Sequence, residues 1–148
     1  MDPISYRPAR PTDLPAILQG ERSYMEDVEP ESLDAWTAAL DANLRLWVDH
    51  LDRTVVAETG DDLAGYAMWQ PDGAAATLIT LHVVPRLRRR GLGHRLLERF
   101  ADDARAAGHT ALNLGVHERN PARFLYPAAG YAQTGVDGEY LLYTRAAD

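Results

Sequence analysis

The sequence lacks cysteine and lysine, and both absences narrow the chemistry. None of its 148 residues is cysteine, so disulfide frameworks, thiolate zinc sites and cysteine nucleophiles are excluded. All 15 basic side chains are arginine, which excludes a Schiff-base lysine, a catalytic lysine and a P-loop lysine. No window approaches the ~20 apolar residues of a membrane span, and no signal-peptide run opens the chain. We therefore expect a cytoplasmic protein with no membrane partner.

The composition is typical of one globular domain. Hydrophobic residues make up 46% of the chain and charged residues 25%, which are proportions of a folded, water-soluble protein. A chain of this length fits one domain, so we predict a single domain over residues 1–148. The net charge is −7. This acidic average argues against a nucleic-acid partner, because such binding depends on neutralising phosphates.

Apolar periodicity and turn residues predict the element order β-α-α-β-β-β-α-β-α-β-β. The strands are expected at 4–8, 54–59, 63–70, 76–84, 110–116, 131–134 and 139–145. The helices are expected from a Thr12 cap to about Tyr24, over 30–50 as one helix or two, over 91–107 with a cap at Gly108, and over 121–129. Two strand-helix-strand passages within this order predict an α/β (α+β) fold with a mixed sheet.

The segment between the strand at 76–84 and the helix at 91–107 carries an unusual loop. It reads Arg86-Leu87-Arg88-Arg89-Arg90-Gly91-Leu92-Gly93-His94. Glycine lets the backbone approach a ligand, and the free N–H groups at a helix start attract anions. A dinucleotide fingerprint would need a third glycine where Leu96 stands, and a Walker loop would need lysine. The loop thus predicts a pyrophosphate cradle, with a solvated basic turn as the alternative.

Two motifs resemble a known family. The acetyl-CoA-binding motif of the GNAT N-acetyltransferase superfamily is similar to Leu81-His82-Val83-Val84-Pro85, followed by Arg88-Arg89-Arg90-Gly91-Leu92-Gly93 and Leu96-Leu97. That family's second motif is similar to Asn120-Pro121-Ala122-Arg123-Phe124-Leu125-Tyr126 and Gly130-Tyr131. With the element order, the resemblance covers residues 4–145. It implies a single GNAT-like domain whose central sheet is largely antiparallel, with helices packed on both faces.

The resemblance also implies a set of residues that bind acetyl-CoA. Backbone groups of Leu81 to Val83 would hold the acetyl carbonyl and the pantetheine arm, and amides of Arg89 to His94 would hold the pyrophosphate. The full set is Leu81, His82, Val83, Arg88, Arg89, Arg90, Gly91, Leu92, Gly93, His94, Asn120 and Tyr126. One departure from the family is that Asn120 stands six residues before Tyr126 instead of seven.

Acetyl transfer from a thioester to an amine needs an oxyanion donor, an acid and a base. A strand N–H at a bulged, splayed end near Val83 could donate a hydrogen bond to the oxyanion. Tyr126 is the candidate general acid, since a phenol of pKa ~10 can protonate a thiolate whose acid has a pKa near ~8.5. His82 and His117, with Glu118 beside the latter, are the candidate bases. Alternation places His82 on the face opposite Ile79, Leu81 and Val83.

The N-terminal helices form the variable substrate wall in this superfamily. Here they carry acidic and aromatic residues, of which Glu21, Tyr24 and Glu26 are the candidate acceptor-binding residues. The others are Asp27, Glu29, Glu31, Asp34 and Trp36. Such a wall could attract an amine cation by charge and cation-π contact, or it could be an ordinary solvent face.

The resulting hypothesis is an acyltransferase that moves acetyl from acetyl-CoA to the primary amine of a small molecule by direct attack. The alternatives are acetylation of a protein N-terminus or lysine, and a non-catalytic acyl-CoA-binding or sensing module. A nucleic-acid module built on 86–90 is the weakest reading, because aromatic residues do not interleave the arginines. No metal site is expected, since the five histidines lack ligand-like spacing. Monomer and homodimer both remain open.

Overall fold

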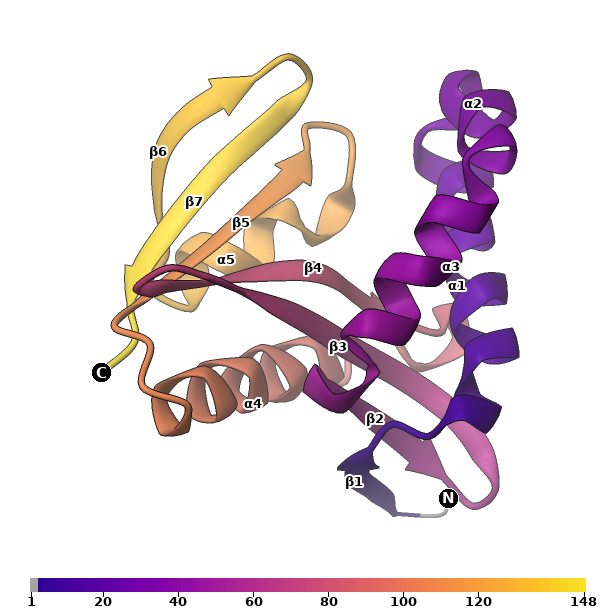
Figure 1. The fold of residues 1–148 in the computed structure, drawn as a ribbon, viewed down its shortest axis with the longest axis horizontal. Helices are drawn as coiled ribbons and strands as arrows, with labels where there is room; N and C mark the ends of the chain where they lie inside the picture. Colours follow the sequence, from indigo (N-terminus) through magenta and orange to yellow (C-terminus); the bar gives the residue numbers. More distant parts are fainter. Residues whose placement is uncertain (1–2) are drawn as a thin grey trace.

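The computed structural model describes residues 3–148 and is built on one seven-stranded sheet (Figure 1). The strand order is β1-β2-β3-β4-β5-β7-β6, and only the β4–β5 pair is parallel. The strands are β1 (Ile4–Pro8), β2 (Thr54–Thr59), β3 (Asp62–Asp72), β4 (Ala75–Val83), β5 (Ala111–His117), β6 (Ala132–Asp137) and β7 (Tyr140–Ala146). The prediction of a mixed, largely antiparallel sheet is confirmed. The first two residues of the predicted 1–148 domain lie outside the described residues.

Helices cover both faces of this sheet, as predicted (Figure 1). One side carries α1 (Leu14–Val28), α2 (Leu33–Ala38) and α3 (Leu40–Asp49), and the other carries α4 (Leu92–Ala106). The short α5 (Leu125–Ala128) follows a 3-10 turn at Pro121–Phe124. The segment predicted as one helix or two forms two, which meet at Ala39. Within residues 3–148, no helix is both long and apolar enough to cross a membrane.

Two hydrophobic clusters hold the layers together. The larger one lies between the sheet and α4, whose buried members are Leu92, Leu96, Leu97, Phe100, Ala101 and Ala104. The smaller one lies under α1 and α3 and consists of Ile17, Trp47, Val56, Tyr66 and Met68. Neighbouring residues of β2 enter different clusters, because successive side chains of a strand point to opposite faces. Each buried large side chain contributes roughly 1.5–3 kcal/mol to the stability of the fold. The two clusters therefore hold the sheet in place beneath the loops at its edge.

The ends of α4 follow from two glycines. Gly91 stands at the N-cap with φ of +83°, and Gly108 follows the C-terminal end with φ of +95°. Both values lie in the left-handed region, where glycine has no steric penalty. Past Gly108, the amide of His109 donates to the carbonyl of Ala104 at 3.0 Å, which closes the helix. The predicted cap at Gly108 is confirmed.

The predicted Thr12 cap of the first helix is wrong. The side chain that organises this turn is Asp13, which accepts the amide N–H of Arg10 at 2.7 Å and two guanidinium bonds from Arg7 at 2.8 and 2.9 Å. The Arg7 guanidinium holds the pKa of Asp13 below its usual value. A buried carboxylate paired with arginine is a stronger anchor than an exposed threonine hydroxyl. Helix α1 is thereby fixed to β1, and it continues to Val28, past the predicted end at Tyr24.

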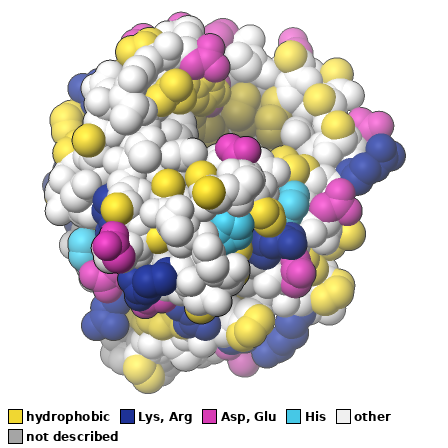
Figure 2. Space-filling model, turned by 60° about the vertical axis from the view of Figure 1, so that its left-hand side comes forward, with side chains coloured by type: hydrophobic (Ala, Val, Ile, Leu, Met, Phe, Trp, Pro, Cys, Tyr) yellow, Lys and Arg dark blue, Asp and Glu magenta, His cyan; other side chains and the backbone are white. Residues whose placement is uncertain are grey.

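Charge is mixed on the face of the molecule that Figure 2 displays. Arginine side chains lie scattered among acidic ones there, and hydrophobic side chains line a hollow in the surface. Interspersed charges do not concentrate a field of one sign. The expectation that nucleic acid is not a partner stays a prediction.

Candidate active site

The site begins where β4 and β5 separate. The two strands pair only at Ala75–Ala111, Ala76–Leu112 and Thr77–Asn113, although β4 continues to Val83 and β5 to His117. Beyond Thr77, the edge of β4 that faces β5 is therefore open to a ligand. In open sheets with parallel strands, ligands bind outside the carboxyl ends of the strands, where the chain departs in different directions.

A β-bulge lies just beyond this point. Met68 of β3 pairs with Thr80 and Trp69 pairs with Leu78, so Ile79 is the extra residue. Ile79 packs with the cluster under α1, whereas Leu81 and Val83 pack with the α4 cluster. The prediction that Ile79 shares the face of Leu81 and Val83 is therefore wrong, because a bulge reverses the alternation. The bulge itself lies at Ile79 and not near Val83.

A cleft of about 500 Å³ runs along the open edge of β4 and over the start of α4. Ten of the twelve residues expected to bind acetyl-CoA line it, namely Leu81, His82, Val83, Arg88, Arg89, Gly91, Leu92, Gly93, His94 and Asn120. The lining does not include Arg90 or Tyr126. Asn120 Oδ1 accepts the amide of Ala122 at 2.9 Å, so this side chain also starts the turn that leads to α5.

The loop before α4 presents donors to this cleft. Arg89 and Gly91 have φ of +64° and +83°, which turn the backbone into the helix. The first bond within the helix runs from Arg95 N to Gly91 O at 3.1 Å. The amides that precede Arg95 therefore point out of the helix end, with the positive end of the helix dipole behind them. At Gly93, a Cβ would stand 3.3 Å from Leu125 Cδ2. These residues fit a pyrophosphate-bearing ligand.

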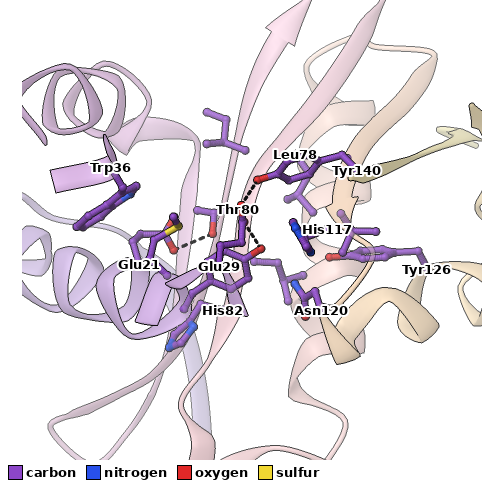
Figure 3. Close-up of a pocket in the computed structure, with 16 residues that line it drawn as sticks. Glu21, Glu29, Trp36, Leu78, Thr80, His82, His117, Asn120, Tyr126 and Tyr140 are labelled. Carbon is purple, nitrogen blue, oxygen red and sulfur yellow. Dashed lines mark hydrogen bonds between the residues drawn. The ribbon is translucent and has the colours of Figure 1, made fainter. Parts of the chain in front are cut away.

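A second cavity, of about 220 Å³, adjoins the cleft (Figure 3). The two spaces share the lining residues Tyr24, Leu81, His82 and Asn120. The cavity draws its walls from α1, α2, β4, β5, β7 and α5. Glu21, Tyr24, Glu29 and Trp36 line it, as the acidic-wall hypothesis expects. Asp27 lines the cleft instead, and neither space is lined by Glu26, Glu31 or Asp34.

Two glutamates give the cavity its polar character. Glu29 is buried and receives the hydroxyls of Tyr24 and Tyr140, both at 2.6 Å. Burial and these bonds raise the pKa of Tyr24 and of Tyr140, so both phenols stay protonated donors. Glu21 receives Tyr66 OH at 2.7 Å and Thr80 Oγ1 at 2.9 Å. Burial raises the pKa of Glu21, and the two hydrogen bonds oppose this rise.

Tyr126, the candidate acid, lies on α5 at the far wall of the cavity. Its ring packs edge-on against the ring of Tyr131 and in a tilted arrangement against that of Tyr143. The ring centroids are 6.1 Å apart in both pairs. Figure 3 shows its hydroxyl directed into the cavity. Burial raises the pKa of Tyr126, so the phenol is protonated at neutral pH. The side chain is thus held rigidly with a proton to donate.

The surroundings of each candidate base work against that role. Burial, with help from Arg88, lowers the pKa of His82 to about 4, so His82 is a weak base. The backbone N–H of Arg119 donates to Nδ1 of His117 at 3.1 Å. The neutral ring therefore carries its proton on Nε2, which lies 3.0 Å from Glu139 Oε2. Both nitrogens of His117 are engaged, and Glu118 is exposed and lines neither space.

The ligand atoms of Glu31, His117 and Glu139 lie within 4.8 Å of one another, a grouping that the sequence spacing did not predict. Arg119 forms an ion pair with Glu31. A metal at Nε2 of His117 would require a proton on Nδ1, where the Arg119 N–H already points. In this arrangement the side chains of the cluster pair with each other and with Arg119 beside the cavity, and the cluster does not fit a cation.

Sequence reasoning missed four residues of this region, namely Tyr66, Thr80, Glu139 and Tyr140. Tyr66, Thr80 and Tyr140 lie on three strands and meet α1 or the α1–α2 turn only after the chain folds. Glu139 lies in the turn before β7 and meets His117 of β5. Strand alternation indicates which face such residues occupy, but it does not identify their partners on a helix far away in sequence. No local motif could have found them.

Comparisons with known proteins agree with this arrangement. The profile of the Acetyltransferase (GNAT) family matches residues 16–131. The chain is 36% identical to the [Ribosomal protein bS18]-alanine N-acetyltransferase of Salmonella typhimurium over 131 residues, which are 87% of this chain and 81% of that protein. It is 33% identical to the mycothiol acetyltransferase of Beutenbergia cavernae over 119 residues, or 78% of this chain. It spans only 36% of the length of that enzyme.

Solved structures share the fold. The PaiA N-acetyltransferase of Thermoplasma acidophilum, in complex with coenzyme A, superposes with a TM-score of 0.83 at 18% identity over 97% of this chain and 99% of that one. Ard1 of Thermoplasma volcanium superposes with a TM-score of 0.77 at 17% identity over 97% of both chains. The fold, the two adjoining spaces and the family profile agree. The chain belongs to the GNAT acetyltransferase family.

Proposed function

We propose that this protein transfers acetyl from acetyl-CoA to the primary amine of a small molecule. One observation carries the proposal: a cleft lined by helix-start amides and arginines adjoins a smaller cavity with two glutamates. The cleft matches the anionic phosphates of CoA. The cavity matches a cationic amine, because carboxylates attract ammonium groups and the aromatic walls add cation-π contact.

Each part of the cleft has an assigned task in this proposal. The amides of Gly91 to His94 would hold the pyrophosphate, and Arg88 and Arg89 would add positive charge beside it. Arg88 is already fixed by its Nε bond to the carbonyl of Val83 at 3.0 Å. The open edge of β4 would hold the pantetheine arm and direct one N–H to the developing oxyanion. Acetyl-CoA supplies an activated thioester, so no covalent enzyme intermediate is needed.

Tyr126 would protonate the departing thiolate. Its hydroxyl faces the cavity that adjoins the cleft, and it is protonated because burial raises its pKa. General acid catalysis of this kind contributes roughly 10²–10⁴-fold in rate. The proton would return to Tyr126 from the acetylated nitrogen.

A second acceptor class is the α-amino group of a protein N-terminus. The relative at 36% identity, which this chain covers to 81%, is named for acetylation of an alanine of a ribosomal protein. An N-terminal amine is also a cation, and a first residue with a small side chain adds little bulk beside it. The acceptor panel below therefore includes both classes.

The test is acetyl-CoA-dependent release of free thiol over a panel of polyamines, aminosugars, amino acids and N-terminal peptides. We expect turnover with a small amine, and the Tyr126→Phe variant should lose at least ~100-fold in kcat with acetyl-CoA affinity retained. Turnover with peptides alone would establish the second class. A Tyr126→Phe variant with unchanged kcat would remove the acid role, and an inactive wild type that binds acetyl-CoA would contradict the proposed reaction.

A further inference from the structure

Direct attack requires a group that takes a proton from the acceptor. An aliphatic amine is an ammonium ion at neutral pH and has no lone pair until it loses a proton. Four titratable groups with the right chemistry line the cavity: Glu21, Glu29, His82 and His117. The two histidines are the weaker candidates, since burial and Arg88 lower the pKa of His82 to about 4 and both nitrogens of His117 are engaged.

The two glutamates differ in how their oxygens are used. In Glu29, Oε2 accepts from Tyr24 and Oε1 accepts from Tyr140. In Glu21, both donors bond to the same oxygen, Oε2. Oε1 of Glu21 has no hydrogen-bond partner in the described part of the chain, and no arginine among residues 3–148 forms an ion pair with this carboxylate. It is an inward-facing carboxylate with one oxygen still available.

The position of Glu21 is fixed on two sides. Tyr66 comes from β3 and Thr80 from β4, directly after the Ile79 bulge. Figure 3 shows the Glu21–Thr80 bond at the wall formed by α1 and β4. Tyr66 OH also reaches the carbonyl of Ile17 at 3.2 Å, which ties the same hydroxyl to the helix that carries Glu21. The carboxylate is therefore held next to the stretch of β4 that lies beyond its pairing with β5.

The surroundings also suit the chemistry. A carboxylate in water is too weak a base for an ammonium ion, but burial raises the pKa of Glu21 toward the range where a general base works best. Tyr66 and Tyr24 face it as protonated phenols, because burial raises the pKa of each. His82 from β4 stays neutral above its pKa of about 4. The other titratable groups that line the cavity are Glu29, His117, Tyr126 and Tyr140.

We propose that Glu21 is the catalytic base, and that its Oε1 takes the first proton from the acceptor ammonium. This rests on the proposed function. One ammonium proton passes to Oε1, and the nitrogen lone pair forms the C–N bond to the acetyl carbon. The C–S bond breaks with its electron pair on sulfur, which takes a proton from Tyr126. The second nitrogen proton restores Tyr126, and Glu21 releases its proton to solvent, so one proton leaves per turnover.

The test compares the pH dependence of kcat/KM in the wild type and in Glu21→Gln, with the amine that the wild type acetylates fastest. Glutamine keeps the size of the side chain and an oxygen for Tyr66 and Thr80, but it cannot take a proton. We expect kcat to fall roughly 100-fold, with a smaller change in acceptor KM. The acid limb that the wild type shows should be replaced by a rise that follows deprotonation of the amine, near the higher pKa of that group. Circular dichroism checks that the variant is folded.

Three further variants make the result decisive. Glu21→Asp keeps a carboxylate and should retain an acid limb at a reduced rate. Glu29→Gln should retain the acid limb as well, because Glu29 is not the base. Asp49→Asn, an exposed carboxylate at the end of α3, should behave as the wild type and controls for the loss of one negative charge from this helical layer.

The outcomes separate this inference from the proposed function. If the wild type acetylates an amine and Glu21→Gln keeps kcat within about threefold with its acid limb, Glu21 is not the base. If Glu21→Gln raises only the acceptor KM, Glu21 binds the ammonium without taking its proton, which also overturns the inference. Loss of the acid limb in Glu29→Gln alone would assign the base to Glu29. A wild type that acetylates no amine overturns the proposed function itself.

Discussion

The cleft and the cavity lie side by side but are built in different ways. Most of the cleft comes from one continuous stretch, from Leu81 to His94, whose strand end, loop and helix start are neighbours in sequence. The cavity draws residues from the first helix to the last strand, and its bonds join positions 59 and 111 residues apart. In the proposed function, a local unit would bind acetyl-CoA, whereas a non-local assembly would determine the acceptor.

This difference has a physical basis. Phosphates are bound by backbone amides, so the cleft needs a chain conformation more than particular side chains. An amine is bound by side-chain oxygens, which must be brought together from several elements at the cost of chain entropy. Changes in the cleft should therefore alter acetyl-CoA affinity for every acceptor. Changes in the cavity should alter the acceptor or the stability and leave acetyl-CoA affinity intact.

The largest effect is expected for Gly93→Val. A Cβ at Gly93 would already stand 3.3 Å from Leu125 Cδ2, with Leu81 and Val83 at 3.9 and 4.0 Å, so the valine methyls would occupy the floor of the cleft. We expect acetyl-CoA to bind about 10- to 100-fold more weakly, by analogy with the 1–3 kcal/mol cost of overpacking. Titration calorimetry with acetyl-CoA measures this.

Gly115→Ala is the matched variant in the cavity. Its Cβ would meet only Leu142, at 3.5 Å, an ordinary contact. We expect unchanged acetyl-CoA affinity and an altered acceptor KM. Equal effects of the two variants on acetyl-CoA affinity would remove the division between the two spaces.

The next effect concerns His82, which lines both spaces. Its pKa is lowered from 6.5 to about 4 by burial and Arg88, so between these values the unfolded chain binds a proton that the folded chain does not. The free energy of unfolding should therefore fall as the pH drops from 7 toward 4, with about 2 kcal/mol of the decrease due to this histidine. Urea unfolding at pH 7 and pH 4.5 should show a smaller decrease in His82→Gln.

His94→Gln provides the comparison, because the His94 side chain is half exposed and pairs with Glu98 on the surface of α4. It should keep the part of the decrease that is due to His82. If His82→Gln shows the same decrease as the wild type, His82 is protonated in the folded protein at the lower pH. In that case the prediction fails, and His82 regains its candidacy as a base.

The smallest effect is expected for Tyr140→Phe. This change removes the hydroxyl that donates to Glu29 at 2.6 Å and joins β7 to the end of α1. We expect a loss of about 1 kcal/mol in the free energy of unfolding, since the bond goes to a buried carboxylate. Acetyl-CoA affinity should not change. Denaturant unfolding and calorimetry on the same preparation measure both quantities.

Arg119→Ala tests the neighbouring rim contact. The Glu31–Arg119 pair joins the α1–α2 turn to the turn after β5, but both side chains are about half exposed. Exposed ion pairs add little to stability, so we expect an unchanged melting temperature. A greater loss for Arg119→Ala than for Tyr140→Phe would show that surface charge and not the buried bond holds the rim together.

Much of the fold could be predicted from the sequence, because its signals are local. The order of elements, the Gly108 cap and the loop before α4 all depend on residues within one or two turns of each other. The exceptions arise where a stronger tertiary contact overrides a local signal. Thr12 is of a residue type that often caps helices, yet Asp13 organises this turn, because Arg7 of β1 binds the Asp13 carboxylate. The Ile79 bulge arises from the register with β3, which no pattern within β4 reveals.

The site was predicted less completely, and for a related reason. The acidic wall indicated that glutamates would face the acceptor, and Glu21 and Glu29 do line the cavity. The sequence could not distinguish these two from Glu26, since all three lie within nine residues. Their phenol partners from β3 and β7, Tyr66 and Tyr140, decide how each carboxylate is used. Those pairings exist only in the folded chain.

The short β4–β5 ladder has a mechanical consequence. It divides the sheet into two half-sheets, β1–β4 and β5–β7–β6, which within the described residues are coupled by the three pairs from Ala75–Ala111 to Thr77–Asn113 and by the bond from Thr110 N to Ala74 O. Spreading the half-sheets about this hinge breaks fewer backbone bonds than bending either of them. A ligand that lies along β4 and also contacts the Asn120 turn after β5 spans the hinge and acts as a brace. Acetyl-CoA should therefore slow amide hydrogen exchange in β5 and β7 as well as in the loop that it touches.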